Sequence, residues 1–160
     1  MIDRALFTLT LLCALGSGLI AGVFFAFSNF VMKALERLPA AQGIAAMQAI
    51  NVTVLNRLFL GIFVGTAIVC VATTVVALAF RRQPFPVAIL VGTALYVVGT
   101  FIVTGACNVP RNDIIAAVDP NSAEAVAVWA DYLRSWTTWN TVRTIASFVS
   151  SASFIIALRG

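Results

Sequence analysis

The stretch SWTTWNTVRT, residues 135–144, holds the residue types with which this chain could bind or transform a ligand. Counted from Trp136, the residues Trp139, Asn140 and Arg143 follow at offsets of 3, 4 and 7, so in a helix they share one face. A charge inside an apolar helix is costly and usually faces a bundle interior or a wet cavity. We therefore expect Arg143 and Asn140 to line a polar pocket. In the alternative, the tryptophans anchor the membrane interface and the polar residues are structural.

A second polar face follows the third apolar stretch of the sequence. In a helix, one face there would hold Thr93, Thr100, Thr104, Cys107 and Arg111, with Asn108 beside it and Asn112 and Asp113 just beyond. The first apolar stretch ends near an asparagine, and two aromatic residues precede the tryptophan pair. We expect these groups to meet at one rim, together with Asn29, Trp129 and Tyr132.

The elements that must position these residues are hydrophobic helices. The chain is 61% hydrophobic and 10% charged, far more apolar than a soluble domain. Four stretches carry no Asp, Glu, Lys or Arg: 5–32, 58–80, 83–110 and 144–158. The first three exceed the roughly 20 residues that cross a bilayer. The fourth does so if its helix begins near Trp136. The sequence thus predicts one all-α integral membrane domain, 1–160, a bundle of four transmembrane helices at about 5–34, 57–80, 84–108 and 136–158.

Two connections carry short extramembrane helices. Residues 39–54 mix apolar and polar side chains as an amphipathic surface helix does, and they form either a covered linker or a lid over a pocket. Residues 122–134 predict a short loop helix. Both lie opposite the tight turn containing Arg81 and Arg82, which we assign to the cytoplasm of a multi-pass cell-membrane protein, together with the N and C termini. Because the outer loops hold six basic residues, this orientation requires that several of them belong to a site.

Composition also excludes several classes of chemistry. The chain has no histidine, which excludes histidine-ligated haem, copper and non-haem iron, and its six carboxylates lack the pattern of a di-iron bundle. The sequence therefore predicts no metal and no cofactor. The basic residues are dispersed, so nucleic acid is not an expected partner. The spacing of Gly18 and Gly22 is typical of close helix packing, within one bundle or between two copies.

Four segments carry a resemblance to a known family: AGVFFAFSNFVMKAL, MQAIN, NVPRNDIIAAVDP and WADYLRSWTTWNTVRT. In this order they resemble the DUF1772 family of small four-helix membrane proteins, which includes the anthrone oxygenase-like proteins, over nearly the whole chain. The family's asparagine and proline correspond to Asn108 and Pro110, and its Trp-Asn-x-x-Arg pattern to Trp139, Asn140 and Arg143. Many relatives resemble WNHVR, whereas this chain has Thr141 at the histidine position.

The resemblance implies a cofactor-independent membrane oxygenase that acts on a flat, lipophilic phenolic or anthrone-like compound. Such an enzyme needs a base, donors for an oxyanion and aromatic walls. The implied base is Asp113, with Asp131 behind it, and the implied oxyanion donors are Arg143, Asn140 and Asn108. The implied substrate-binding residues are Trp136, Trp139, Tyr132, Trp129, Asn112, Arg111 and Asn29. Alternatively, Arg143 pairs with Asp113 and makes that carboxylate a poor base.

A different class of function stays open beside the oxygenase. The chain could be a non-catalytic membrane protein that binds a lipid or quinone-like ligand, or an accessory subunit of a membrane complex. Its expected partners are the bilayer, a small aromatic or lipid ligand, and a second copy or a larger complex. An enzyme requires a cavity in which Asp113 or Asp131 converges with Arg143, whereas a structural role requires those groups to be paired and closed.

Overall fold

The computed structural model describes residues 2–80 and 87–159, which form helices connected by short turns, with no strand among them. The predicted turn at Arg81 and Arg82 lies outside these residues. In chain order the elements, with π-helical segments labelled η, are α1 (Ile2–Ala26), η1 (Phe27–Val31), α2 (Met32–Glu36), α3 (Ala40–Thr53), α4 (Arg57–Ala79), α5 (Val87–Ala94), η2 (Leu95–Ile102), η3 (Thr104–Asn108), α6 (Val109–Ala117) and α7 (Ala125–Ala157).

Within the residues that the structure describes, three helical rods are long and apolar enough to cross a membrane, which suggests a membrane protein. They are Arg4–Glu36, Arg57–Ala79 and Val87–Ala117. The first continues from α1 through η1 into α2, and the third from α5 through η2 and η3 into α6. The third rod therefore ends nine residues beyond the predicted 108. Pro110 does not end it, because the proline occupies the first turn of α6, where its missing N–H is not needed.

The fourth rod, α7, is one helix of 33 residues, Ala125–Ala157, that joins most of the predicted loop helix, 122–134, to nearly all of the predicted last span, 136–158. It is less apolar than the other rods because its inner face is polar. Ser147, Ser150 and Ser153 are buried on it. α7 packs against α1, α5 and η2, so neighbouring helices cover this face. That α7 crosses a membrane stays a prediction.

The interior holds small polar side chains beside its apolar core, and the outer faces hold large apolar side chains. Ser150 Oγ donates to the Gly92 carbonyl at 2.7 Å, and the hydroxyls of Thr100 and Ser147 are bonded at 2.7 Å. Leu15, Ile68 and Phe148, by contrast, are more than half exposed. This pattern is typical of helices that associate within lipid, where interhelical hydrogen bonds contribute about 0.6–1.7 kcal/mol each.

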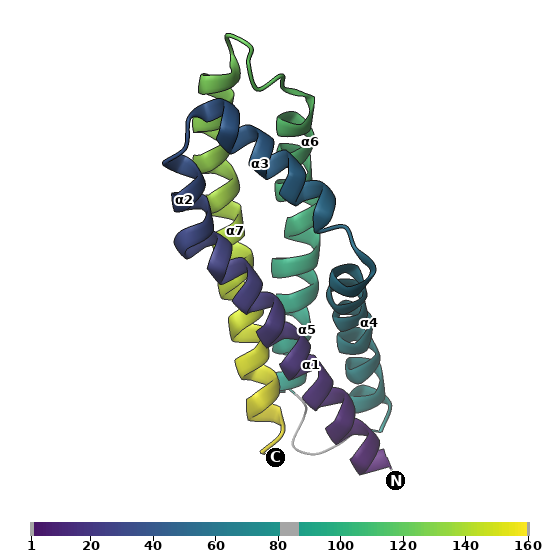
Figure 1. Ribbon diagram of the computed structural model, residues 1–160. Helices are drawn as coiled ribbons and strands as arrows, with labels where there is room; N and C mark the ends of the chain where they lie inside the picture. The colour runs from purple at the N-terminus through teal and green to yellow at the C-terminus, as the bar shows by residue number, and fades with distance from the viewer. Residues whose placement is uncertain (1, 81–86, 160) are drawn as a thin grey trace.

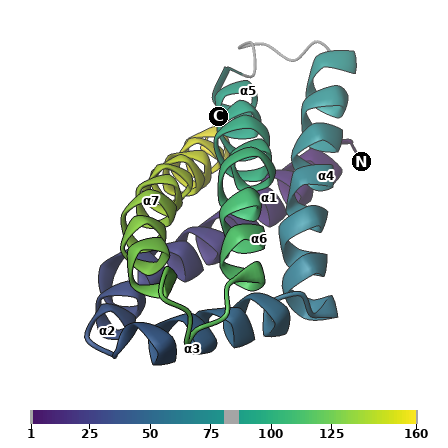
Figure 2. The same cartoon turned by 90° about the horizontal axis from the view of Figure 1, so that it is seen from above.

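Helix α3 crosses one end of the bundle, and both chain ends lie at the opposite end (Figure 1). Seen from above, α3 runs past the ends of α7, α6 and α4 (Figure 2). Two contacts fix α3 there. Gln48 Nε2 donates to the carbonyls of Ile115 and Val118 at 2.9 and 3.0 Å, and Gly43 packs directly against the Trp129 indole. α3 is therefore docked on the bundle as a cover.

Candidate functional site

Arg143 lies inside the bundle on α7, and the residue is only 5% exposed. Its Nε and Nη2 donate to Asn140 Oδ1 at 3.0 and 2.8 Å, and Nη1 donates to Thr104 Oγ1 at 3.2 Å. Among the described side chains, no carboxylate forms an ion pair with it. The guanidinium lies over the rings of Phe24 and Trp136, 4.0 and 5.1 Å from their centroids. This is a buried cation stabilised by neutral acceptors and aromatic faces.

Asn140 connects this cation to the first helical rod. Its Nδ2 donates to the Phe24 carbonyl at 2.7 Å and to Ser28 Oγ at 2.6 Å, so only Oδ1 faces Arg143. Ser28 belongs to η1 and Thr104 begins η3, so a π-helical segment contributes a polar group on each side of α7. Segments of this kind are rare and occur frequently at functional sites.

A cavity of about 200 Å³ adjoins the Arg143 guanidinium. Residues from all the rods and from α3 line it: Val23, Phe24, Phe27, Met47, Ile50, Asn51, Val54, Leu55, Phe59, Leu60, Phe63, Thr104, Val109, Asn112, Trp136 and Arg143. Leu55, Leu60 and Val109 are 66%, 37% and 43% exposed, so one side of the cavity opens on an apolar surface. A lipophilic molecule could enter there from a bilayer.

Two of the polar side chains that line the cavity, Arg143 and Asn112, present hydrogen-bond donors. Asn112 Oδ1 accepts from the Tyr132 hydroxyl at 2.9 Å and from Trp136 Nε1 at 2.7 Å. The Asn112 amide nitrogen is left to donate to a ligand. Thr104 Oγ1 donates to the Thr100 carbonyl, and Asn51 Nδ2 is buried without a partner. The lining contains no carboxylate. The cavity is therefore suited to a ligand that presents oxygen acceptors.

Five aromatic residues belong to the wall: Phe24, Phe27, Phe59, Phe63 and Trp136. Phe59 and Phe63 stack with centroids 5.8 Å apart, and Phe63 stacks on Phe101 at 5.3 Å. Phe27 packs against Trp136 at 5.9 Å. Flat faces around one cation favour a flat, delocalised ligand. The rings of such a ligand can stack on the aromatic side chains while its negative charge pairs with the guanidinium.

The other residues predicted for the site occupy several environments. Asn108 is fully buried and donates to the Trp136 carbonyl at 3.2 Å, while its Oδ1 has no partner. Trp129 is buried under Gly43 and stacks on Tyr132, with centroids 5.7 Å apart. Trp139 and Arg111 are half-buried and Asn29 is exposed, and none of the three lines the cavity. Of the predicted residues, Arg143, Trp136 and Asn112 meet at the cavity, and Asn140 and Tyr132 support them.

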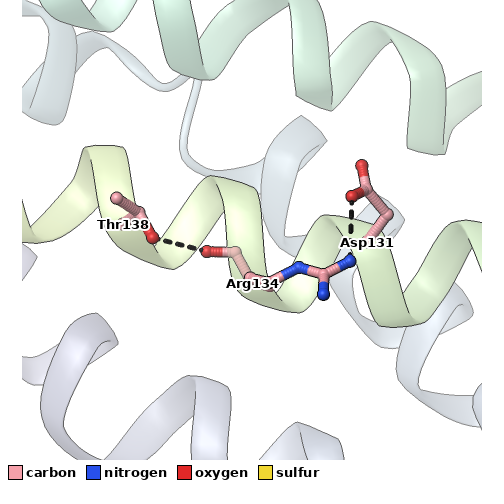
Figure 3. A network of polar contacts seen from close by, with 3 residues as sticks. All are labelled: Asp131, Arg134 and Thr138. Carbon is pink, nitrogen blue, oxygen red and sulfur yellow. Dashed lines mark hydrogen bonds and ion pairs between the residues drawn. The ribbon is translucent and has the colours of Figure 1, made fainter.

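The two carboxylates proposed as bases lie away from the cavity. Asp113 is exposed and does not line it. Asp131 is paired with Arg134 at 3.4 Å, with the two side chains 70% and 78% exposed, and Arg134 in turn offers its carbonyl to Thr138 on the same face of α7 (Figure 3). The predicted convergence of Asp113 or Asp131 with Arg143 is not present in this arrangement.

Several cavity residues were not assigned to the site from the sequence. Phe24, Phe59 and Phe63 read as ordinary apolar positions of spans, and no periodicity separates them from lipid-facing phenylalanines. Asn51 reads as part of the polar face of a surface helix. The available signal was its place in the segment MQAIN, one of the four that carry the family resemblance.

The fold and the site together define a class: an all-helical protein with three rods able to span a membrane, and with a buried cation in an aromatic cavity. The chain belongs to the anthrone oxygenase family, whose model matches residues 56–153, more than half of the 160. This match contains Thr104, Asn112, Trp136, Asn140 and Arg143. Comparisons with curated proteins and with solved structures gave no match.

Proposed function

We propose that this protein is a cofactor-independent membrane oxygenase that acts on a flat, lipophilic phenolic or anthrone-like compound. One observation carries the proposal: Arg143 is a buried cation without a carboxylate partner among the described residues, and it forms part of the wall of an aromatic cavity that opens on an apolar surface. Membership of the anthrone oxygenase family supports an oxygenase-type reaction.

The chemistry converts a ring CH₂ into a carbonyl. Loss of one proton from the CH₂ gives a delocalised carbanion whose charge rests largely on the carbonyl oxygen of the same ring. The carbanion reduces O₂ and combines with it, and a proton then completes a hydroperoxide at that carbon. The O–O bond breaks as the second C–H proton leaves, which gives the carbonyl and one water. One O₂ is consumed, with one oxygen atom in the product and one in water.

In this reaction the protein stabilises the anion. Arg143 would pair with the carbonyl oxygen of the substrate as its charge develops, and a donor positioned in advance at a developing oxyanion is effective at this task. Asn140 holds the guanidinium in place. The Asn112 amide is a second donor, and Phe24, Phe59 and Trp136 hold the flat rings. Since no carboxylate lines the cavity, the substrate proton would pass to water.

The proposal includes a membrane arrangement with four crossings. α7 would be the fourth crossing, because neighbouring rods cover its polar inner face. The chain termini would face the cytoplasm and α3 the outer side. A cysteine introduced at the exposed Gln42 of α3 tests this orientation. Labelling of intact cells by an impermeant maleimide is the expected result, and labelling only after lysis would reverse the orientation.

A second function has one specific observation in its favour. The cavity offers donors and no base, and this suits a quinone-like ligand that is bound without being transformed. A non-catalytic quinone-binding protein would hold a carbonyl at Arg143. Under this alternative, ligand binding depends on Arg143 but no O₂ is consumed.

Isotope labelling separates the two functions. Purified protein in detergent is incubated with anthrone under ¹⁸O₂, and the quinone is analysed by mass spectrometry. The oxygenase predicts one ¹⁸O atom per quinone, formed faster than in buffer alone. Formation at the spontaneous rate, together with binding of anthraquinone that Arg143→Met abolishes, would contradict the oxygenase and favour the binding function.

A further inference from the structure

The first helical rod and α7 meet along a seam that holds two further hollows. A cleft of about 320 Å³ lies between α2 and α7, and its charged residues are Lys33, Glu36 and Arg134. A groove of about 520 Å³ lies between α1 and α7, lined by Gly18, Gly22, Phe25, Thr144, Ile145 and Phe148. None of these residues lines the cavity at Arg143. The seam is therefore a surface separate from that cavity.

The cleft and the groove follow one line along the two rods. On the first rod their lining residues recur every three or four positions, at Gly18, Gly22, Phe25, Ser28, Met32 and Glu36. On α7 they recur at intervals of three, four and seven, at Ala130, Arg134, Thr137, Thr144 and Phe148. Such intervals keep residues on one face of a helix. One elongated molecule could therefore occupy the cleft and the groove together.

The groove is open and apolar. Its walls are Phe25, Ile145 and Phe148, which are 55%, 59% and 68% exposed. Its floor includes Gly22, where no described atom lies within 4 Å of an added Cβ. Wall atoms beside an unfilled space lose dispersion contacts on that side, and an alkyl chain would restore them.

The cleft, by contrast, carries charges of both signs. Lys33 and Glu36 come from α2, and Arg134 comes from α7. Arg134 directs only its Nη2 to Asp131, at 3.4 Å (Figure 3), and arginine has five N–H donors. Two cations match a phosphate, and a carboxylate matches an amine. Basic pockets between transmembrane helices bind lipid head groups.

The length of the seam matches one leaflet of a bilayer. Lys33 follows Gly18 by 15 positions, which is about 22 Å along a helix at 1.5 Å per residue. Half of a bilayer, with its head groups, is about 20–22 Å thick. A phospholipid with its phosphate in the cleft would therefore lay an acyl chain along the groove.

We infer that this seam binds one phospholipid with an amine-bearing head group. Its phosphate lies between Lys33 and Arg134, its amine at Glu36 and one acyl chain in the groove over Gly22. This site is additional to the aromatic cavity and does not depend on the proposed oxygenase reaction.

Native mass spectrometry of the purified protein tests this site. Protein freed of lipid by detergent exchange is titrated with phosphatidylethanolamine, with phosphatidylglycerol and diacylglycerol of the same chains, and with inorganic phosphate. The variants are the double variant Lys33→Gln/Arg134→Gln and Gly22→Leu, which fills the groove. Gly61→Leu is the matched control, because a Cβ at Gly61 also meets no described atom within 4 Å.

Two further measurements report on the fold of each variant. One is thermal unfolding. The other is the affinity for 2-naphthol, a small flat phenol, measured by quenching of tryptophan fluorescence because Trp136 lines the cavity. No residue changed in these variants lines the cavity, so this affinity should change less than about twofold.

We expect the wild type and Gly61→Leu to bind one phosphatidylethanolamine at least about tenfold more tightly than diacylglycerol. Phosphatidylglycerol should bind more weakly than phosphatidylethanolamine because it offers no amine to Glu36, and inorganic phosphate should not bind. The double variant should lose at least about tenfold in affinity for phosphatidylethanolamine and keep its affinity for diacylglycerol. Gly22→Leu should weaken the binding of both lipids.

Three results would overturn the inference. The first is binding of several lipids with affinities that depend on neither head group nor variant, which would show annular lipid only. The second is a dimeric wild type that Gly22→Leu converts to a monomer, since a second copy would then occupy the groove. The third is tighter binding of phosphatidylglycerol than of phosphatidylethanolamine. A wild type that binds phosphatidylethanolamine as expected but not 2-naphthol would contradict the proposed function alone.

Discussion

Asn140 holds Arg143 by two hydrogen bonds to a single oxygen, with Nε and Nη2 at 3.0 and 2.8 Å from Oδ1. The acceptor is an amide and not a carboxylate, so the guanidinium is fixed in position without being neutralised. Asn140 is in turn fixed by the Phe24 carbonyl and Ser28. A pre-positioned cation of this kind is what an anionic or strongly polarised ligand oxygen requires.

Asn140→Asp should keep Arg143 in position but neutralise it. We expect at least about tenfold weaker binding of 2-naphthol, because the cation then has a buried carboxylate partner. The new carboxylate also loses the donor to the Phe24 carbonyl, at a cost of about 1–3 kcal/mol of stability. Ser28→Ala is the matched control, since it removes one Asn140 partner without adding charge. Equal loss of 2-naphthol binding in both variants would show that binding depends on how Asn140 positions Arg143 and not on the unneutralised charge of Arg143.

Asp113→Asn and Asp131→Asn should each leave O₂ uptake within about twofold of the wild type. Asp113 is exposed and does not line the cavity, and Asp131 is paired with Arg134 at the surface. Exposed pairs contribute at most about 1 kcal/mol, so stability should also change little. The measurement is the initial rate with anthrone. A loss of activity in Asp113→Asn with the fold intact would restore that carboxylate as the base.

Gly43→Ala should loosen the cover that α3 forms. A Cβ at Gly43 would lie 2.7 Å from Trp129 Cζ2, so α3 or the indole must move. Met47, Ile50 and Asn51 of α3 line the cavity. We therefore expect the affinity for 2-naphthol to fall at least about threefold and the free energy of unfolding to fall by about 1–3 kcal/mol. Ala45→Ser, at an exposed position of the same helix, is the control. Unchanged affinity in Gly43→Ala would separate α3 from the site.

Gly99→Val should destabilise the bundle without touching the cavity. A Cβ at Gly99 would lie 2.6 Å from the Cβ of Ala146, so η2 and α7 could not approach as closely as they do. Overpacking of this kind costs about 1–3 kcal/mol. Gly105→Ala provides the comparison, since nothing lies within 4 Å of a Cβ there. Thermal unfolding in detergent gives the answer, and equal midpoints for the two variants would contradict close packing at Gly99.

The sequence could predict the rods because charge-free runs longer than a bilayer leave few alternatives. It could not place the helix ends: Pro110 by itself predicts a break, yet it lies where a helix tolerates proline. Nor could the sequence predict that the segments before and after Trp136 form one helix, since this depends on how α7 packs against α1 and η2.

The residues of the site also include some that the sequence could place and some that it could not. The positions of Arg143 and Asn140 on one inner face follow from helical period alone. The exposed position of Asp113 does not, because it depends on the rotation of α6 against α7. Asn51 faces the cavity only because Gln48 and Gly43 dock α3 across the end of the bundle. Contacts between elements far apart in the chain leave no periodic signal in a single sequence.

The most direct test of the account is the initial rate of O₂ uptake with anthrone, measured on purified wild type, Arg143→Met and Arg134→Met. Arg143 is buried at the cavity, whereas Arg134 is 78% exposed and paired with Asp131. The account predicts uptake above the spontaneous rate for the wild type and Arg134→Met, and at least a tenfold loss for Arg143→Met, the effect of removing one donor to a developing oxyanion. Uptake at the spontaneous rate in the wild type, or full activity in Arg143→Met, would contradict it.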